Sequence, residues 1–88
     1  MKNLINVFND VATFIESAKA NGVDVFFSYS PHVGGITFSI YKGGKWTEDN
    51  EIESMFKIYL NEFDEHFKQV VETVIDKYYL TDIKNETI

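Results

Sequence analysis

The chain has 88 residues, enough for one small domain, and a hydrophobic share of 44% with fourteen aromatic residues excludes an intrinsically disordered chain. It contains no cysteine, which excludes a disulfide framework, a thiol nucleophile and a thiolate metal site. Its formal net charge at pH 7 is −6, and all eight basic residues are lysine, so the bidentate contacts that arginine makes with phosphate are also excluded.

The acidic charge is concentrated in the second half of the chain. Residues 1–47 carry four lysines against three acids, whereas residues 48–88 carry four lysines against eleven acids. An acidic half of this kind repels nucleic acid and anionic lipid, and it favours basic partners. We therefore expect no direct binding to nucleic acid or to a membrane.

The sequence also predicts a cytoplasmic protein. No apolar run approaches the length of a membrane-spanning helix. Asn6, Asn9 and Asp10 interrupt the apolar core that a signal peptide would need. The absence of cysteine fits a reducing compartment.

The first predicted element is a helix over residues 4–20. Its apolar residues recur at intervals of three and four, which places them on one helix face. They are Leu4, Val7, Phe8, Val11, Phe14, Ile15 and Ala18. Asn21 and Gly22 follow, and we expect them to end the helix because glycine readily adopts the left-handed conformation found there.

Two strands are predicted next, at residues 23–30 and 36–42. Each alternates apolar and more polar residues, as strands with one buried face do. Pro31 separates them, and their apolar faces should both meet the first helix. The pair Gly43-Gly44 then indicates a two-residue hairpin turn, which predicts a short third strand over residues 45–47.

Residues 48–79 show a helical period without any glycine or proline. The apolar positions are Ile52, Met55, Phe56, Tyr59, Leu60, Phe63, Phe67, Val70, Val71, Val74, Ile75 and Tyr78. A straight helix of about 30 residues would be roughly 45 Å long. We expect it either to break near residues 61–64 or to protrude and pair with a second copy. Residues 81–88 are polar and should form a frayed tail.

Together these elements predict an α+β fold in a single domain covering residues 1–88. The expected order is α-β-β-(β)-α, with a further helix if the last one breaks. A small antiparallel sheet should pack on the N-terminal helix and on the long C-terminal helical region.

The sequence offers no convincing catalytic or cofactor site. "YKGGKWTEDNE" resembles a phosphate-binding loop, but Ser39 stands at the first glycine position and Trp46 separates Lys45 from Thr47. Glu62 and His66 are one helical turn apart and could share a metal, yet a third ligand is hard to name. We therefore predict a protein that is not an enzyme and that uses no cofactor or metal.

The strongest candidate is an acidic face on the predicted C-terminal helix. At about 100° per residue, five carboxylates project into one sector, and one apolar residue could serve there as an anchor. The partner-binding set is Glu51, Ile58, Glu62, Glu65, Glu72 and Asp76. This row of carboxylates could imitate a phosphate backbone and occupy a basic nucleic-acid channel on another protein. The alternative is a solvated face that only keeps the domain soluble.

Two resemblances bear on this layout. The order α-β-β-β-α resembles that of double-stranded-RNA-binding domains, but their lysine-rich helix start is replaced here by "TEDNEIE". A small acidic chain with a helix, a short sheet and then acidic helices is similar to some prophage anti-CRISPR proteins, and that resemblance implies inhibition of a nuclease by DNA mimicry. We therefore predict a phage-encoded, non-enzymatic inhibitor that binds a basic host protein. The alternative is a structural or regulatory domain that forms a homodimer through its long helix.

Overall fold

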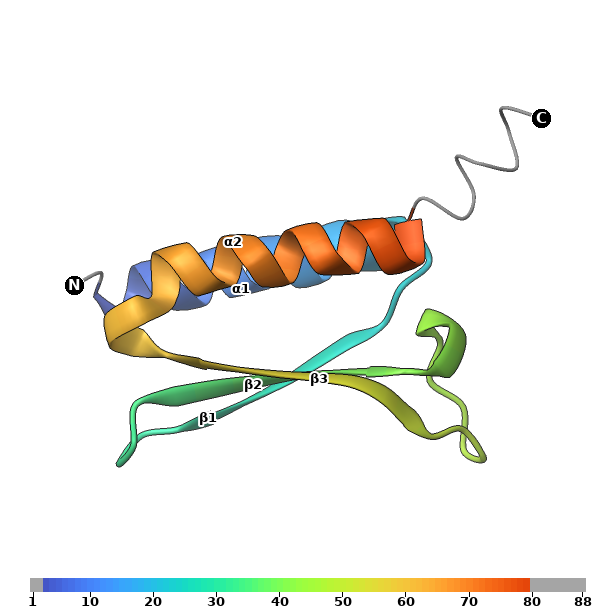
Figure 1. Ribbon diagram of the computed structural model, residues 1–88, viewed down its shortest axis with the longest axis horizontal. Coiled ribbons are helices and arrows are strands. Elements are labelled where there is room, and N and C mark those ends of the chain that lie inside the picture. The colour runs from blue at the N-terminus through green and yellow to red at the C-terminus, as the bar shows by residue number, and fades with distance from the viewer. Residues whose placement is uncertain (1–2, 80–88) are drawn as a thin grey trace.

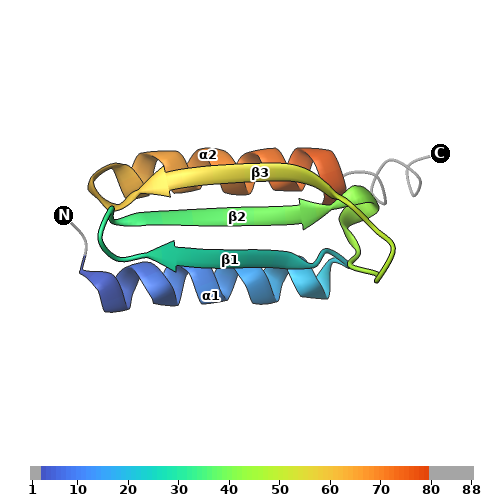
Figure 2. The ribbon, with the colours of Figure 1, turned by 90° about the horizontal axis from the view of Figure 1, so that it is seen from below.

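The computed structural model describes residues 3–79 and confirms the α+β class. The helices are α1 (Leu4–Ala20) and α2 (Phe63–Val74), and the strands are β1 (Val25–Ser30), β2 (Gly35–Tyr41) and β3 (Ile52–Tyr59). The three strands form one antiparallel sheet in the order β1-β2-β3. Both helices cover the same face of that sheet (Figure 1), with α1 alongside β1 and α2 alongside β3 (Figure 2). None of the helices within the described range is long and apolar enough to cross a membrane.

The first helix has the predicted bounds. Asn3 caps its start, because the Asn3 Oδ1 accepts a hydrogen bond of 2.9 Å from the backbone N–H of Asn6. Gly22 follows its end with a φ of +81°, which a residue with a side chain adopts only at a cost. Four residues of the predicted apolar face are buried: Val7, Val11, Phe14 and Ala18.

The first two strands also form the predicted hairpin. Phe27 lies opposite Phe38 and Val25 opposite Ile40, so the apolar side chains of both strands turn toward the helices. Ile36, Phe38 and Ile40 of the central strand are completely buried. The more polar residues predicted for the other face lie on the side of the sheet that no described element covers (Figure 2).

The connection between β2 and β3 is longer than predicted. Gly43 and Gly44 do have positive φ angles, but they belong to a turn at Lys42–Gly44 and do not form a two-residue hairpin. The loop then runs to Glu51 and is closed by Asn50, whose Nδ2 donates to the carbonyl oxygens of Lys42 at 2.8 Å and Lys45 at 2.7 Å. The predicted strand over residues 45–47 is therefore wrong.

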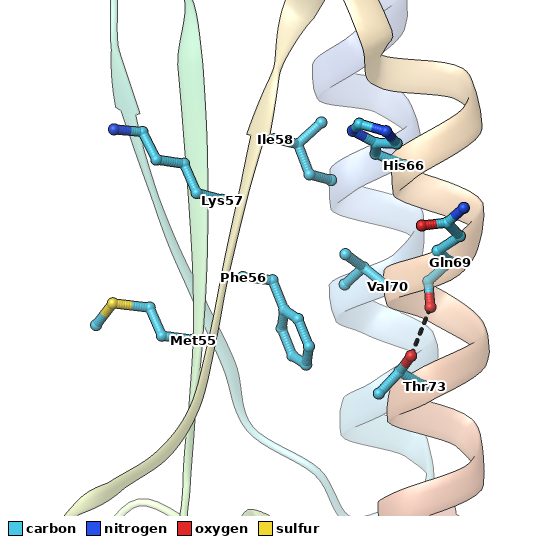
Figure 3. A pocket seen from close by; sticks show the side chains of 8 residues that line it. All are labelled: Met55, Phe56, Lys57, Ile58, His66, Gln69, Val70 and Thr73. Atoms are coloured by element: carbon cyan, nitrogen blue, oxygen red, sulfur yellow. Dashed lines mark hydrogen bonds between the residues drawn. The ribbon is translucent and has the colours of Figure 1, made fainter.

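The helix predicted from residue 48 is wrong as far as residue 62. Residues 52–59 form β3, which pairs with β2 from Ile52 to Tyr59 with one irregularity, a bulge at Glu53. Phe56 and Ile58 turn toward α2, while Met55 and Lys57 turn away from it (Figure 3). Ser54 is buried and bonds to Tyr78 and Lys77 of the helical region. A tight turn at Leu60–Glu62 then leads into α2. The predicted break near residues 61–64 is in fact the place where the helix begins.

The second helix is 12 residues long and continues as a π-helical segment over Ile75–Tyr79. It lies along the sheet and does not protrude from it (Figure 1). Phe63, Val70 and Val74 of α2 are buried, and Phe67 packs edge-on against Phe14 of α1 with ring centroids 5.6 Å apart. The predicted tail, residues 81–88, lies outside the described residues.

Candidate interaction surface

The outer side of α2 carries most of the predicted acidic face. We use the term α2 acidic face for its four exposed carboxylates: Glu62, Glu65, Glu72 and Asp76. At about 100° per residue they fall in a sector of roughly 80°, opposite the buried residues of the helix. Gln69 lies in the same sector and Lys68 lies outside it. Of the four, Glu65 and Glu72 lie in α2 itself, Glu62 is the residue just before it, and Asp76 lies in the π-helical segment that continues it.

The other two predicted residues of the face lie elsewhere. Glu51 stands at the end of the loop before β3, where its Oε2 is 3.1 Å from the Lys42 Nζ. Ile58 is only 1% exposed and belongs to the core, so it cannot be the apolar anchor of a surface. Both placements have the same cause, because a strand replaces the helix on which the projection of Glu51 and Ile58 depended.

A groove runs between β3 and α2, directly beside the α2 acidic face (Figure 3). Its volume is about 390 Å³, and Phe56, Ile58 and Val70 supply apolar lining. His66, Gln69 and Thr73 of α2 form a polar side, and Thr73 Oγ1 donates a 2.8 Å hydrogen bond to the carbonyl oxygen of Gln69. The sequence pattern does not indicate this groove, because the groove forms only when residues 52–59 are a strand that lies beside α2.

Glu62 and His66 connect the groove with the acidic face. The Glu62 Oε2 is 3.5 Å from the His66 Nδ1, which is the contact expected of side chains four residues apart on a helix. His32 lies in the turn between β1 and β2. No group of three His, Cys, Asp or Glu side chains that could hold a metal occurs within residues 3–79.

A polar chain of hydrogen bonds ties the end of the helical region to the start of β3. Lys77 Nζ donates to the Ser54 Oγ at 3.1 Å, and the Tyr78 hydroxyl donates to the Glu53 Oε1 at 2.9 Å. The Ser54 and Tyr78 hydroxyls are 2.9 Å apart. Since Tyr78 already donates to a carboxylate and Ser54 already accepts from an ammonium group, Ser54 donates to Tyr78.

This chain predicts how Tyr78 affects stability. Burial raises the pKa of Tyr78 above its usual 10.0, and the bond to Glu53 raises it further, against a lowering by Ser54. The unfolded chain therefore loses the phenol proton first, and stability falls as pH rises above 10. Tyr78→Phe should lower the free energy of unfolding by about 1 kcal/mol at pH 7. It should also remove the part of the stability loss above pH 10 that comes from the Tyr78 hydroxyl.

Urea unfolding of both chains from pH 7 to 11 measures the effect. Tyr59→Phe serves as the control, because Tyr59 is 44% exposed and lies on the other face of the sheet. A wild-type chain that loses stability above pH 10 no faster than Tyr78→Phe would contradict the assignment.

The uncovered face of the sheet is more apolar than a solvated face requires. Phe26 is 45% exposed, Ile52 44% and Met55 62%. Phe26 packs edge-on against Tyr41, with 5.6 Å between ring centroids, and the Lys57 Nζ lies 5.4 Å from the centroid of Tyr59. The structure thus separates an apolar sheet face from the acidic outer side of α2.

No protein-family model, curated protein or solved structure matches this chain.

Proposed function

We propose that this chain is a small non-enzymatic interaction protein that binds a basic surface of another protein through the α2 acidic face. The observation that carries the proposal is a row of four exposed carboxylates with no lysine in its sector: Glu65 and Glu72 in α2, Glu62 just before it and Asp76 in the π-helical segment after it. Lys77 does not neutralise this sector, because it contacts Ser54 and lies 3.9 Å from Glu53. Carboxylates held on one rigid helix lose little freedom when a partner binds.

These carboxylates extend over a length comparable to a short stretch of one nucleic-acid strand. Glu62 and Asp76 are fourteen residues apart, which corresponds to about 20 Å along a helix. A strand of DNA carries one phosphate per roughly 3.4 Å, or about six over the same length. The face offers four charges in that span, so it could occupy a basic channel that recognises a row of negative charge more than base identity.

The proposed partner is therefore a protein whose basic surface normally holds nucleic acid. The resemblance to DNA-mimicking anti-CRISPR proteins points in the same direction and suggests a phage-encoded inhibitor of a host nuclease. The groove between β3 and α2 lies directly beside the charges and offers the polar side chains of His66, Gln69 and Thr73 with part of Phe56. Contacts in this groove would add to screened surface charges and lengthen the lifetime of the complex.

The test compares two pairs of charge reversals. Glu65→Lys with Glu72→Lys changes the α2 acidic face, while Glu48→Lys with Asp49→Lys makes the same change of net charge in the exposed loop before β3. Each chain is immobilised, and nucleic-acid-binding proteins from a bacterial lysate are captured and then displaced with duplex DNA. We expect the α2 pair to abolish capture and the loop pair to retain it.

Capture that survives the α2 pair, or that duplex DNA fails to displace, would overturn the proposal. A guide-RNA-dependent nuclease provides a defined probe, and the wild-type chain should reduce its binding to target DNA. Equal loss of capture in both pairs would show that only net charge matters, which would also contradict a specific face.

A further inference from the structure

The two edges of the sheet differ in how they are protected. β1 and β3 are both edge strands, because the sheet order is β1-β2-β3. β3 carries Glu53 and Lys57, the kind of charge that keeps an edge from pairing with another chain. β1 reads VFFSYS and contains neither a charged residue nor a proline. Its outer backbone groups therefore form an open template for another strand.

An apolar stripe on α1 lies next to the open edge of β1. Ile5, Phe8, Ala12 and Ile15 recur at intervals of three and four, beside the buried stripe of the helix. Ile5 is 73% exposed, the highest value among the exposed large apolar side chains, and Phe27 of β1 is 45% exposed. Phe8 joins the helix to the strand, since its ring centroid is 6.4 Å from that of Phe27 and 5.3 Å from that of Tyr29.

We call this surface the β1 border, which consists of two groups on neighbouring elements. They are Ile5, Phe8, Ala12 and Ile15 of α1, and Phe26 and Phe27 of β1. α1 runs alongside β1 at one side of the molecule, and α2 runs alongside β3 at the other (Figure 2). The β1 border is therefore apolar on both the helix and the strand. It lies on the side of the molecule opposite to the α2 acidic face (Figure 2).

We propose that the β1 border binds a second copy of this chain, with the two β1 strands pairing antiparallel across a two-fold axis. A strand is self-complementary in this arrangement, and a register centred on Phe27 places Phe27 opposite its mate and Phe26 opposite Ser28. The two sheets then become continuous, and the α1 stripes face each other with the small Ala12 near the middle.

Charge restricts where a second copy can bind. A chain with a net charge of −6 repels another copy of itself over most of its surface. The β1 border contains no acidic residue, and Lys19 follows its stripe at the end of α1, so the repulsion is weakest here. The pairing also keeps the two α2 acidic faces far apart at the outer sides. The dimer leaves those faces free, so this inference does not depend on the proposed function.

The test measures the molar mass of the full chain by light scattering over a wide concentration range. We expect a dimer that dissociates on dilution. Phe27→Lys places like charges opposite one another at the axis, and Ile5→Lys places a lysine against the end of the mate's α1 stripe, where Lys19 lies. Made separately, each should raise the dissociation constant about tenfold or more. Met55→Lys is the matched control, because Met55 lies on the open face of β3, away from this border.

Hydrogen exchange adds a second measurement on the same samples. The amides of residues 25–30 should exchange more slowly as concentration rises, and those of β3 should not. Ile5 is 73% exposed, so Ile5→Lys should keep the wild-type circular dichroism spectrum and the melting temperature that the wild-type chain has when diluted to a monomer. A wild-type chain that stays monomeric at every concentration, or a dimer unaffected by both lysine variants, would overturn the proposal.

Discussion

Ile58→Asp is expected to leave the chain largely unfolded at 25 °C, whereas Met55→Asp is expected to leave it folded. Ile58 is 1% exposed and points from β3 toward α2, while Met55 is 62% exposed and points away (Figure 3). A buried carboxylate without a partner costs several kcal/mol, against a total stability of roughly 5–15 kcal/mol for a small domain. The exposed substitution should cost no more than about 1 kcal/mol.

These two variants also test whether residues 52–59 form a strand, as in the structure, or the helix that the sequence pattern predicts. On a helix, Met55 belongs to the apolar stripe and Ile58 to the acidic face, so the two effects would be reversed. Far-ultraviolet circular dichroism and urea unfolding of the two variants measure the difference. Unfolding of Met55→Asp together with a native Ile58→Asp would contradict the placement of β3.

The sequence predicts α1, β1 and β2 correctly because each of them has one apolar and one polar face. In β3 both faces carry apolar residues, with Phe56 and Ile58 on the core side and Ile52, Met55 and Tyr59 on the open side. Their combined spacing imitates a helical period, and no glycine or proline separates Tyr59 from α2. A strand that is apolar on both faces loses the alternation by which strands are recognised.

The candidate surface was predictable only where the helix is real. The projection places Glu65, Glu72 and Asp76 on one side because the chain is helical from residue 63 to residue 79, and Glu62 stands just before that helix. Glu51 and Ile58 were misplaced because the projection continued that period through a loop and a strand. The groove and the β1 border were not predictable, since both depend on which strands become neighbours, and a local pattern does not specify the order of strands in a sheet.

The packing of both helices on one face makes the central strand the most sensitive part of the core. Phe38 of β2 is completely buried. Its ring centroid lies 5.9 Å from that of Phe14 on α1 and 6.0 Å from that of Phe67 on α2. The side chain therefore holds the sheet and both helices together, and no other element can move to fill its place without losing contacts of its own.

Phe38→Ala should therefore lower the free energy of unfolding by about 3–5 kcal/mol, the range for a buried aromatic residue, because both the burial and the packing around the cavity are lost. Tyr59→Ala is the matched control, since Tyr59 lies on the uncovered face of β3 and is 44% exposed. Urea midpoints at constant slope measure the two losses. If Phe38→Ala fails to fold, Phe38→Leu should fold with a smaller loss because it fills most of the space. Equal losses at Phe38 and Tyr59 would mean that the helices do not share this side of the sheet.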